Sequence, residues 1–417
     1  MKVVYVGGCG RLGLPLAAVS ADCGHEVFCA DINQEMVDRV NAGDVDTMEP
    51  GVTDLVAEYG GKELQATTDI AEACSWGELI NVIVPTPSKR GGSFSNAFIL
   101  DACERIGLGM CKNSEYQVVN IVSTVMPGSV NGEIATALSA WAAGVLGEEW
   151  GITYSPEFVA QGRIVRDFRH PDMVMIGADT ERASDVVARY YRSIVDVEDN
   201  FVPFRFMSVA SAEVAKIALN VSVVTKIQLA NQVAMICHNT PGANAGDVLG
   251  AIGDDSRIGH RYFSPGVWPG GPCFPRDCRA LSAHAGITDT PAVLIGGVEA
   301  FTNVMAHWLA AQVWHYGSRI GILGLTYKPG VDIMEESPGI KLGEMLPSAA
   351  VVWYHDPTSD RVPSLDEVVD MCDVLVLMTP WEAYHALEEM DLSGKTVIDM
   401  WGFLDSNKIP ALIRFGG

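Results

Sequence analysis

Residues 2–31 read KVVYVGGCGRLGLPLAAVSADCGHEVFCAD, and this stretch decides the fold of the N-terminal part of the chain. A β-branched run, a glycine-rich turn, an apolar helix and a second β-branched run follow one another, which predicts a βαβ unit of the kind that binds dinucleotides. In such a unit Gly8 makes the turn, Gly10 lets a pyrophosphate approach the backbone, and Gly13 lets the helix pack closely on the strand. The amides at the helix N-terminus favour an anion there.

An acidic residue, Asp31, ends the second predicted strand, 18 residues after Gly13 (31 − 13). A carboxylate at this place binds ribose hydroxyls and repels a 2′-phosphate, so the pattern favours NAD over NADP. We expect Arg11 and Leu12, inside the turn, to line the same cofactor site. The alternative is a glycine-rich turn that only packs an ordinary α/β domain, but the combination of strand, turn, helix and acid favours the cofactor.

Two further apolar runs, LINVIVPTP (79–87) and QVVNIVSTVMPG (117–128), end in threonine, proline and glycine. Ligands of open α/β sheets bind outside the carboxyl ends of the strands. Thr86 and Thr124 are therefore predicted to face the cofactor cleft. As an alternative, each threonine caps the segment that follows it.

Residues 208–237 contain no glycine or proline and predict one unusually long helix, suited to a spine between domains or to a dimer interface. Lys216 and Asn220 are four residues apart and share one face of this helix. A lysine on a helix is usually solvated, so the spacing alone leaves a functional role open.

A second α/β region begins near Gly317. Its predicted strands are RIGILGL, AAVVWYHDP, CDVLVLMTP and GKTVIDMWG, and helical segments such as 364–371 alternate with them. The predicted fold class is α/β, with two Rossmann-like doubly wound domains joined by a helical central domain that contains one long helix. The expected domain bounds are 1–200, 201–305 and 306–417.

The composition excludes several classes of partner. The net charge of −24 argues against nucleic acid and against an anionic membrane. We expect no run long enough to span a membrane and no signal peptide. Ten scattered cysteines without a CxxC pair suggest reduced thiols in a cytoplasm, and nine histidines without HExxH predict no metal site.

The stretch WPGGPCFPRDCRAL (268–281) holds Cys273 in a turn stiffened by glycine and proline, with an Arg-Asp pair beside it. A buried structural cysteine does not need such surroundings. The residues alone leave a buried thiol and a nucleophile both open, and Cys278 is expected to be a packing residue.

Eight stretches, in order along nearly the whole chain, resemble the UDP-glucose/GDP-mannose dehydrogenase family. They are GCGRLGLPLA, NAGDVDTMEPGVTDL, VPTPS, STVMPGS, YSPEFVAQG, SAEVAKIALN, GGPCFPRD and GLTYKPGVDIMEESP. The resemblance implies an NAD-dependent oxidation of a nucleotide-sugar C6 hydroxymethyl to a carboxylate, with two NAD⁺ reduced. Cys273 would carry a thiohemiacetal and then a thioester. UDP-glucose is the favoured substrate, and GDP-mannose and a UDP-N-acetylhexosamine are alternatives.

The resemblance also implies roles for individual residues. Lys216 would stabilise an oxyanion, Asn220 hold a sugar oxygen, Asp277 assist the hydrolytic water, Thr124 position that water, and Glu157 serve as acid/base or water partner. The resemblance further implies that Arg276 contacts the cofactor and lies beside the thiolate, and that Lys328 contacts the diphosphate. The residues that would contact the sugar nucleotide are Phe158, Tyr262, Ser264, Gly266 and Gly270. A homodimer through the central helix is also expected.

Some positions depart from the family pattern. Met36, Ala160, Gln161, Glu335 and Trp401 stand where relatives usually carry a charged residue. Each departure removes or reverses a polar contact, which predicts an active enzyme with altered cofactor affinity or sugar choice; the alternative is slow or impaired turnover. Two other functions stay open: a two-electron dehydrogenase of the 3-hydroxyacid type, and a non-catalytic nucleotide-sugar binding protein.

Overall fold

The computed structural model describes residues 1–196 and 202–417. The chain divides into two compact units, Met1–Ile217 and Ala218–Gly417, and the boundary falls inside the helix α9 (Val209–His238). The first predicted domain boundary, at 200/201, lies outside the described residues. The second, at 305/306, lies inside the helix α12 (Val293–Tyr316).

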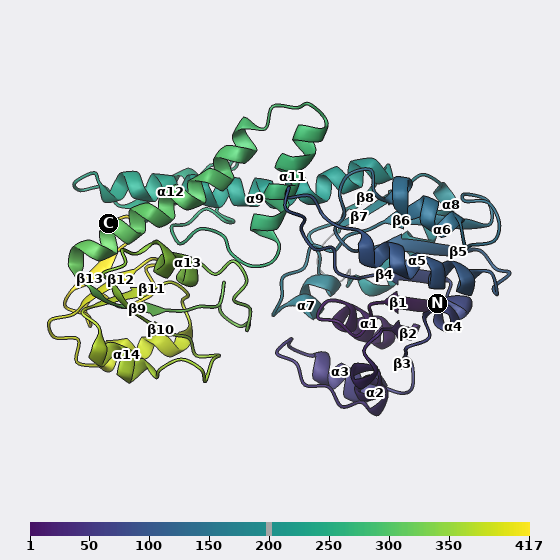
Figure 1. Cartoon of the computed structure of the whole chain (residues 1–417), viewed down its shortest axis with the longest axis horizontal. Helices are drawn as coiled ribbons and strands as arrows, with labels where there is room; N and C mark the ends of the chain where they lie inside the picture. Colours follow the sequence, from purple (N-terminus) through teal and green to yellow (C-terminus); the bar gives the residue numbers. More distant parts are fainter. Residues whose placement is uncertain (197–201) are drawn as a thin grey trace. The chain divides into compact units, whose positions relative to one another are not determined.

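The N-terminal unit is built on an eight-stranded sheet with the order β3-β2-β1-β4-β5-β6-β7-β8 (Figure 1). Neighbouring strands are parallel except for the pair β6 and β7. The strands are β1 (Lys2–Val6), β2 (Glu26–Ala30), β3 (Leu64–Thr67), β4 (Leu79–Val82), β5 (Gln117–Ile121), β6 (Trp150–Tyr154), β7 (Val174–Ala178) and β8 (Phe204–Met207). The order 3-2-1-4-5-6 within it is that of the Rossmann fold.

Both faces of this sheet are covered, which is why its strands read as continuous apolar runs. Along β1, Val3 and Tyr5 enter one buried cluster, whereas Val4 and Val6 enter the other. The helices of this unit are α1 (Gly13–Asp22), α2 (Gln34–Ala42), α3 (Val52–Tyr59), α4 (Ile70–Trp76), α5 (Ala97–Met110), the π-helix η1 (Val130–Ile134), α6 (Ala135–Ser139), α7 (Ile164–Arg169) and α8 (Glu181–Ile194).

The C-terminal unit contains a five-stranded, wholly parallel sheet with the order β10-β9-β11-β12-β13. Its strands are β9 (Arg319–Leu323), β10 (Val351–His355), β11 (Val374–Leu377), β12 (Thr396–Asp399) and β13 (Leu412–Arg414). The sequence predicted the first four and missed β13, which has three residues. This is the doubly wound order 2-1-3-4-5. Val374 and Val376 of β11 pack on one face, and Leu375 and Leu377 pack on the other.

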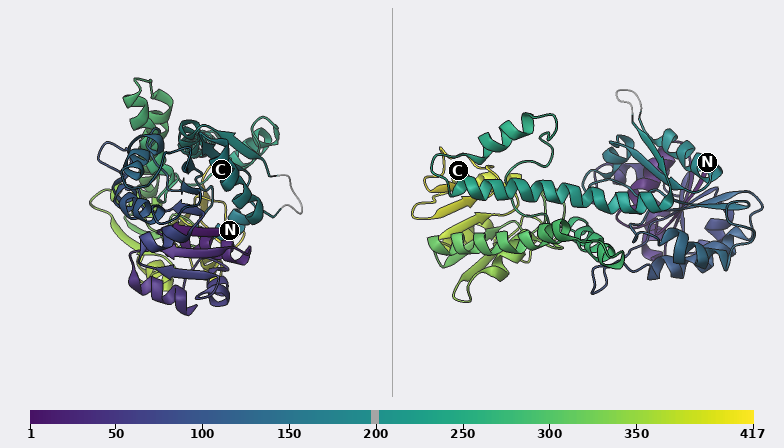
Figure 2. Two further views of the ribbon diagram at one scale, coloured as in Figure 1. Left: turned by 90° about the vertical axis from the view of Figure 1, so that its right-hand side faces the viewer. Right: turned by 90° about the horizontal axis from the view of Figure 1, so that it is seen from above.

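The remaining elements are helical. α9 is one unbroken helix of 30 residues (Figure 2), close to the predicted 208–237. The others are α10 (Ala245–Asp254), α11 (Phe274–Ile287), α12, α13 (Pro338–Met345), α14 (Leu365–Met371) and the 3₁₀ helix η2 (Glu382–Glu389). The predicted fold class of two doubly wound domains and a helical central part is confirmed.

One helix among the described residues, α12, is long and apolar enough to cross a membrane by length and composition, with a mean hydropathy of 1.2 in its best window. The expectation that no such segment exists was therefore wrong. A core helix of a soluble protein passes the same test. Met305, Leu309 and Val313 of α12 are fully buried in the cluster that covers the C-terminal sheet.

Candidate active site

The glycine-rich turn lies between β1 and α1. Gly8 lies in the turn closed by the hydrogen bond from the Gly10 amide to the Gly7 carbonyl (3.3 Å), but the positive φ, +81°, belongs to Gly7. A Cβ on Gly13 would lie 2.4 Å from the Gly7 oxygen, so only glycine lets α1 begin this close to β1. A Cβ on Gly10 would meet only that oxygen, at 3.4 Å, so this side of the turn is open enough for a pyrophosphate.

Asp31 lies at the carboxyl end of β2 and is hydrogen-bonded to the turn. Its Oδ2 accepts the Cys9 amide and its Oδ1 accepts the Asn33 amide, both at 3.0 Å. The carboxylate is thus held beside the glycine-rich turn, where a dinucleotide would place a ribose. Arg11 is exposed and Leu12 partly buried at the start of α1.

The structure brings Thr86 and Thr124 together. Thr86 follows β4 and is buried, and its Oγ1 donates to the Thr124 carbonyl at 2.7 Å. Thr124 follows β5, the neighbouring strand. Both threonines therefore lie beyond the carboxyl ends of their strands; β4 pairs with β1, which leads into the glycine-rich turn, and β5 pairs with β4.

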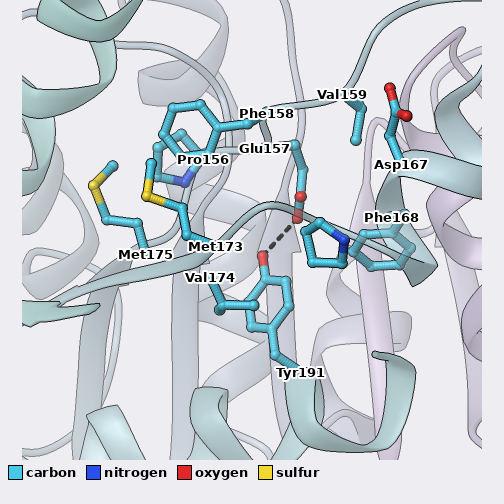
Figure 3. Close-up of a pocket in the computed structure, with 11 residues that line it drawn as sticks. Pro156, Glu157, Phe158, Val159, Asp167, Phe168, Met173, Val174, Met175 and Tyr191 are labelled. Carbon is cyan, nitrogen blue, oxygen red and sulfur yellow. Dashed lines mark hydrogen bonds between the residues drawn. The ribbon is translucent and has the colours of Figure 1, made fainter. Parts of the chain in front are cut away.

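Glu157 follows β6 and lines a small pocket (Figure 3). The Tyr191 hydroxyl, on α8, donates to Glu157 Oε1 at 2.6 Å. Lys216 is nearly buried on α9; its Nζ donates to the Glu157 carbonyl and lies 4.4 Å from the centre of the Phe158 ring. Glu157, Phe158 and Lys216, all predicted site residues, are thus in one cluster. Tyr191 was not predicted, because nothing near it in the sequence marks it.

Burial raises the pKa of Glu157 to about 7, against the opposing effects of the Tyr191 hydroxyl and the Lys216 charge. A carboxyl group with this pKa is divided between its protonated and ionised forms near neutral pH. It can therefore both give and take a proton, which suits general acid–base catalysis.

The segment that carries Glu157 is held by two carboxylates that the sequence analysis did not assign. Glu49, from the TMEPG stretch, is buried and accepts the amides of Gly162 and Ile164, both at 2.6 Å. Asp167 accepts the Ala160 amide at 3.0 Å. These bonds fix the backbone on the carboxyl side of Glu157.

Cys273 is the N-cap residue of α11, and its side chain is exposed. The end of a helix with unpaired amides is a favourable place for a thiolate. The preceding turn is tightly packed: a Cβ on Gly270 would lie 2.6 Å from the Glu336 carbonyl, and one on Gly271 would lie 2.7 Å from the Tyr327 ring. Glycines are thus required beside this cysteine. Cys278 is buried, as predicted for a packing residue.

Asn220 and Asp277 are in contact. The Asn220 side-chain amide donates to Asp277 Oδ2 at 2.6 Å, and Arg276 Nε approaches Asp277 Oδ1 at 3.4 Å. Asp277 is fully buried one turn after Cys273 on α11, and its amide bonds to the Cys273 carbonyl at 2.9 Å. The structure thus brings Asn220 and Asp277 together, one helical turn from Cys273.

Apart from Phe158, the residues predicted to contact the sugar nucleotide lie in loops of the C-terminal unit. Tyr262 is exposed with φ +59°, Ser264 is exposed, and Lys328 lies 5.6 Å from the Tyr327 ring. Gly266 is buried against the Trp401 ring, which a Cβ would approach to 2.6 Å.

Two of the departures from the family pattern have clear structural surroundings. Glu335 has an exposed side chain, while its carbonyl accepts the Gly271 amide at 3.0 Å. Its neighbour Glu336 has φ +52° and pairs with Arg279 at 2.6 Å. Met36 packs on the core of the N-terminal unit.

The predicted site residues divide between the two units. The N-terminal unit contains the glycine-rich turn, Asp31, Thr86, Thr124, Glu157, Phe158 and Lys216. The C-terminal unit contains Asn220, Cys273, Arg276, Asp277, Lys328 and the other predicted sugar-nucleotide residues. Within residues 1–196 and 202–417, no group of three His, Cys, Asp or Glu side chains is placed to hold a metal ion.

Three sequence profiles of the UDP-glucose/GDP-mannose dehydrogenase family match the chain. The NAD-binding domain matches residues 1–195, the central domain 210–303, and the UDP-binding domain 321–406. A UDP-glucose 6-dehydrogenase of Haloferax volcanii is 31% identical over 92% of both chains. A GDP-mannose 6-dehydrogenase of Pseudomonas syringae is 28% identical over 96% of both chains.

The solved structures agree with this. A UDP-glucose dehydrogenase from Pyrobaculum islandicum has a TM-score of 0.89 and 28% identity, covering 99% of this chain and 97% of its own. The matched profiles span most of the described residues, and the glycine-rich turn and the cysteine turn fall within them. The chain belongs to the UDP-glucose/GDP-mannose dehydrogenase family.

Proposed function

We propose that this protein, an NAD-dependent nucleotide-sugar 6-dehydrogenase, acts on UDP-glucose and releases UDP-glucuronate. The observation that carries the chemistry is Cys273, an exposed thiol at the N-terminus of α11 on a turn that only glycine can form. The UDP-glucose relatives of Haloferax volcanii and Pyrobaculum islandicum support the substrate. The 28% identity to a GDP-mannose 6-dehydrogenase makes GDP-mannose the second candidate.

The reaction balances as an alcohol oxidised by four electrons. The C6 alcohol, two NAD⁺ and one water become a carboxylate, two NADH and three protons. Removal of two electrons gives an aldehyde, and the Cys273 thiolate then forms a C–S bond to the aldehyde carbon. Removal of two more electrons leaves a thioester. Water attacks the thioester carbon, the C–S bond breaks, and the thiolate returns.

The residues of the N-terminal unit fit NAD. The close approach of Gly7 and Gly13, the open side of Gly10 and the carboxylate of Asp31 match a pyrophosphate and a ribose diol. When bound, the cofactor supplies the two-electron acceptor for each oxidation. Thr86 and Thr124, at the adjacent strand ends, are proposed to contact it.

Protons and charge are handled by side chains of this chain. Glu157, with its pKa near 7, is proposed to exchange a proton with the substrate or with the hydrolytic water. Lys216 is proposed to stabilise oxyanions, since its ammonium is nearly buried and a buried cation acts strongly. Asn220 is proposed to hold a sugar oxygen, and Asp277, buried beside it, to orient the water.

The remaining contacts are proposed from the family pattern. Lys328 binds the diphosphate, Arg276 contacts the cofactor, and Phe158, Tyr262, Ser264, Gly266 and Gly270 line the sugar-nucleotide site. Lys328 matters because a protein with a net charge of −24 needs a local cation for a dianionic ligand.

We further propose a homodimer in the cytoplasm. Leu229 and Ile236 on α9 are 51% and 61% exposed, and Val304 on α12 is 57% exposed; a second copy would cover such exposed apolar side chains. Light scattering after gel filtration should give about twice the 44.7 kDa chain mass. A Leu229→Glu/Ile236→Glu variant should elute as a monomer.

The test of the function is a panel of nucleotide sugars with NAD⁺. UDP-glucose should be oxidised fastest, with two NADH formed for each sugar consumed and no free aldehyde. A faster reaction with GDP-mannose would transfer the assignment to the second candidate. One NADH per sugar with released aldehyde would reject the thioester route in favour of a two-electron dehydrogenase, and no turnover on any sugar would favour a binding protein.

A further inference from the structure

Glu213 is a fully buried acid that the chemistry above does not use. It lies on α9, one turn before Lys216, with 0% of its surface exposed. Its Oε2 accepts the Gly128 amide at 2.6 Å, and its Oε1 accepts the Val130 amide at 2.8 Å. Both carboxylate oxygens are therefore bonded to the loop that follows β5.

The loop is shaped to present these amides. Gly128 has φ +90°, and a Cβ there would meet nothing within 4 Å, so the residue is glycine for its backbone angle and not for space. Successive amides turned to one side form a concavity that binds an anion. Here the anion is a side chain of α9 instead of a ligand.

The same loop begins with Thr124, and its start is held as well. Thr86 Oγ1 donates to the Thr124 carbonyl, and the Ser123 hydroxyl both accepts the Val84 amide (2.9 Å) and donates to the Val84 carbonyl (2.7 Å). The stretch from Ser123 to Val130 is thus tied to β4 at one end and to α9 at the other. Glu213 supplies the tie to α9.

We propose that Glu213 is a positioning residue, whose carboxylate fixes the Thr124 loop against the turn of α9 that carries Lys216. This inference rests on the proposed function, in which Thr124 positions the hydrolytic water and Lys216 stabilises the oxyanion. A displacement of about 1 Å in such a pair lowers a rate by about 10²-fold. Glu213 touches no reacting atom and acts through the loop.

A carboxylate is required for chemical reasons. It offers an acceptor at both oxygens, whereas the end of a glutamine offers one acceptor and one donor. In Glu213→Gln, one of the two loop amides would face an N–H group. The hydrogen bonds from the loop amides oppose the effect of burial, which raises the pKa of Glu213.

The first experiment measures hydrogen exchange of the full chain without substrate. In Glu213→Gln, peptides that contain Gly128 and Val130 should exchange about tenfold faster than in the wild type, the effect of one lost hydrogen bond. Glu104→Gln is the control, because it removes the same charge and Glu104 is exposed on α5 of the same unit. It should exchange as the wild type does. Equal protection in all three proteins would overturn the proposed anchor.

The second experiment separates the steps of turnover by rapid mixing. With NAD⁺ and UDP-glucose, Glu213→Gln should form the first two NADH per site at a near-normal rate, then turn over about 10²-fold more slowly. Acid quenching should show more substrate bound covalently to Cys273 than in the wild type. The KM for NAD⁺ should change less than threefold. Glu213→Asp, which keeps the charge, should recover part of the rate.

A structural defect would look different. If NAD⁺ affinity, the rate of formation of the first NADH and the turnover rate all fell by the same factor, the positioning role would be rejected. If Glu213→Gln does not fold, Gly128→Ala perturbs the same loop from its other side and should give the same accumulation on Cys273. Normal turnover in Gly128→Ala with altered exchange would also reject it. If the wild type forms no adduct at all, the thioester route fails, whereas hydrogen exchange still decides on the anchor.

Discussion

Two cysteines five residues apart differ completely in setting. Cys273 is exposed at a helix N-terminus, whereas burial of Cys278 raises the pKa of its thiol to about 12. Cys273→Ser should bind NAD⁺ normally but lose turnover by about 10³-fold or more, as loss of a covalent nucleophile does. Cys278→Ala should lose stability and keep most of the turnover per folded protein. Steady-state rates and calorimetric NAD⁺ titration of both variants test these expectations. Near-normal turnover of Cys273→Ser would show that Cys273 is a packing residue and not the nucleophile.

Glu157 should make stability depend on pH. Its pKa in the folded protein, about 7, is above the ordinary 4.5, so the folded state binds more protons between these values. Stability is then highest below pH 4.5, falls as pH rises through the window, and is lowest above 7. Glu157→Gln removes this loss, so its stability relative to the wild type should be greater at pH 8 than at pH 5, by up to about 3 kcal/mol.

Urea unfolding at the two pH values measures this difference, with Glu104→Gln, at an exposed position on α5, as the control. An equal effect of Glu157→Gln at pH 5 and pH 8 would contradict the raised pKa. The same variant should lose activity, because a group that is costly to ionise in the folded state is retained for its proton.

Asp31 should set the choice of cofactor. Asp31→Asn keeps an acceptor for only one of the Cys9 and Asn33 amides, and it removes the charge that repels a 2′-phosphate. The ratio of kcat/KM for NAD⁺ to that for NADP⁺ should fall about tenfold or more, the size of one charged contact. Asp38→Asn, exposed on α2, should leave the ratio unchanged. Equal use of both cofactors by the wild type would show that Asp31 does not face the ribose.

For individual residues, the sequence predicted which residues form the site but not which groups their side chains contact. Lys216 and Asn220 were grouped by helical spacing, yet the partner of Lys216 is the Glu157 carbonyl and that of Asn220 is Asp277. Glu49, Tyr191 and Glu213 were missed because their roles depend on contacts with segments distant in sequence. Only the acids inside the MEPG and SAEVAK stretches gave any signal, and neither stretch indicates a bond to backbone amides.

Among the elements, the turn before α11 and the loop between β9 and α13 each contain a glycine, and the two form a matched pair. Gly271 and Gly330 both have positive φ, at +81° and +77°, but a Cβ on Gly271 would lie 2.7 Å from the Tyr327 ring whereas one on Gly330 would meet nothing. Gly330→Ala should therefore lose only the backbone term, about 1 kcal/mol. Gly271→Ala should lose more and also displace Cys273, lowering kcat. Thermal unfolding and kcat of both variants test this. Equal losses of stability and of kcat in the two variants would mean that the Tyr327 ring moves aside for the added Cβ.

The elements themselves were predictable where a strong periodicity or a long apolar run marked them. The βαβ start, α9 and the strands β9 to β12 were all found close to their predicted ranges. β13 has three residues, which is too short for a pattern. The antiparallel placement of β7 could not be predicted, because strand direction depends on the path of the chain between β6 and β7.

For the whole molecule, burial divides the thiols into two classes that respond differently to peroxide. Burial raises the pKa of Cys372 to about 11 and of Cys103 to about 12, and Cys9, Cys29, Cys74, Cys237 and Cys278 are buried too. Exposed side chains belong to Cys111 and Cys273, while Cys23 is intermediate. Peroxide oxidises accessible thiolates first, giving a sulfenic acid and water. Because eight thiols are shielded at least in part, brief oxidation should inactivate the protein by a single lesion at Cys273. A thiol reductant should restore the activity. The Cys111→Ser variant should be inactivated at the same rate as the wild type.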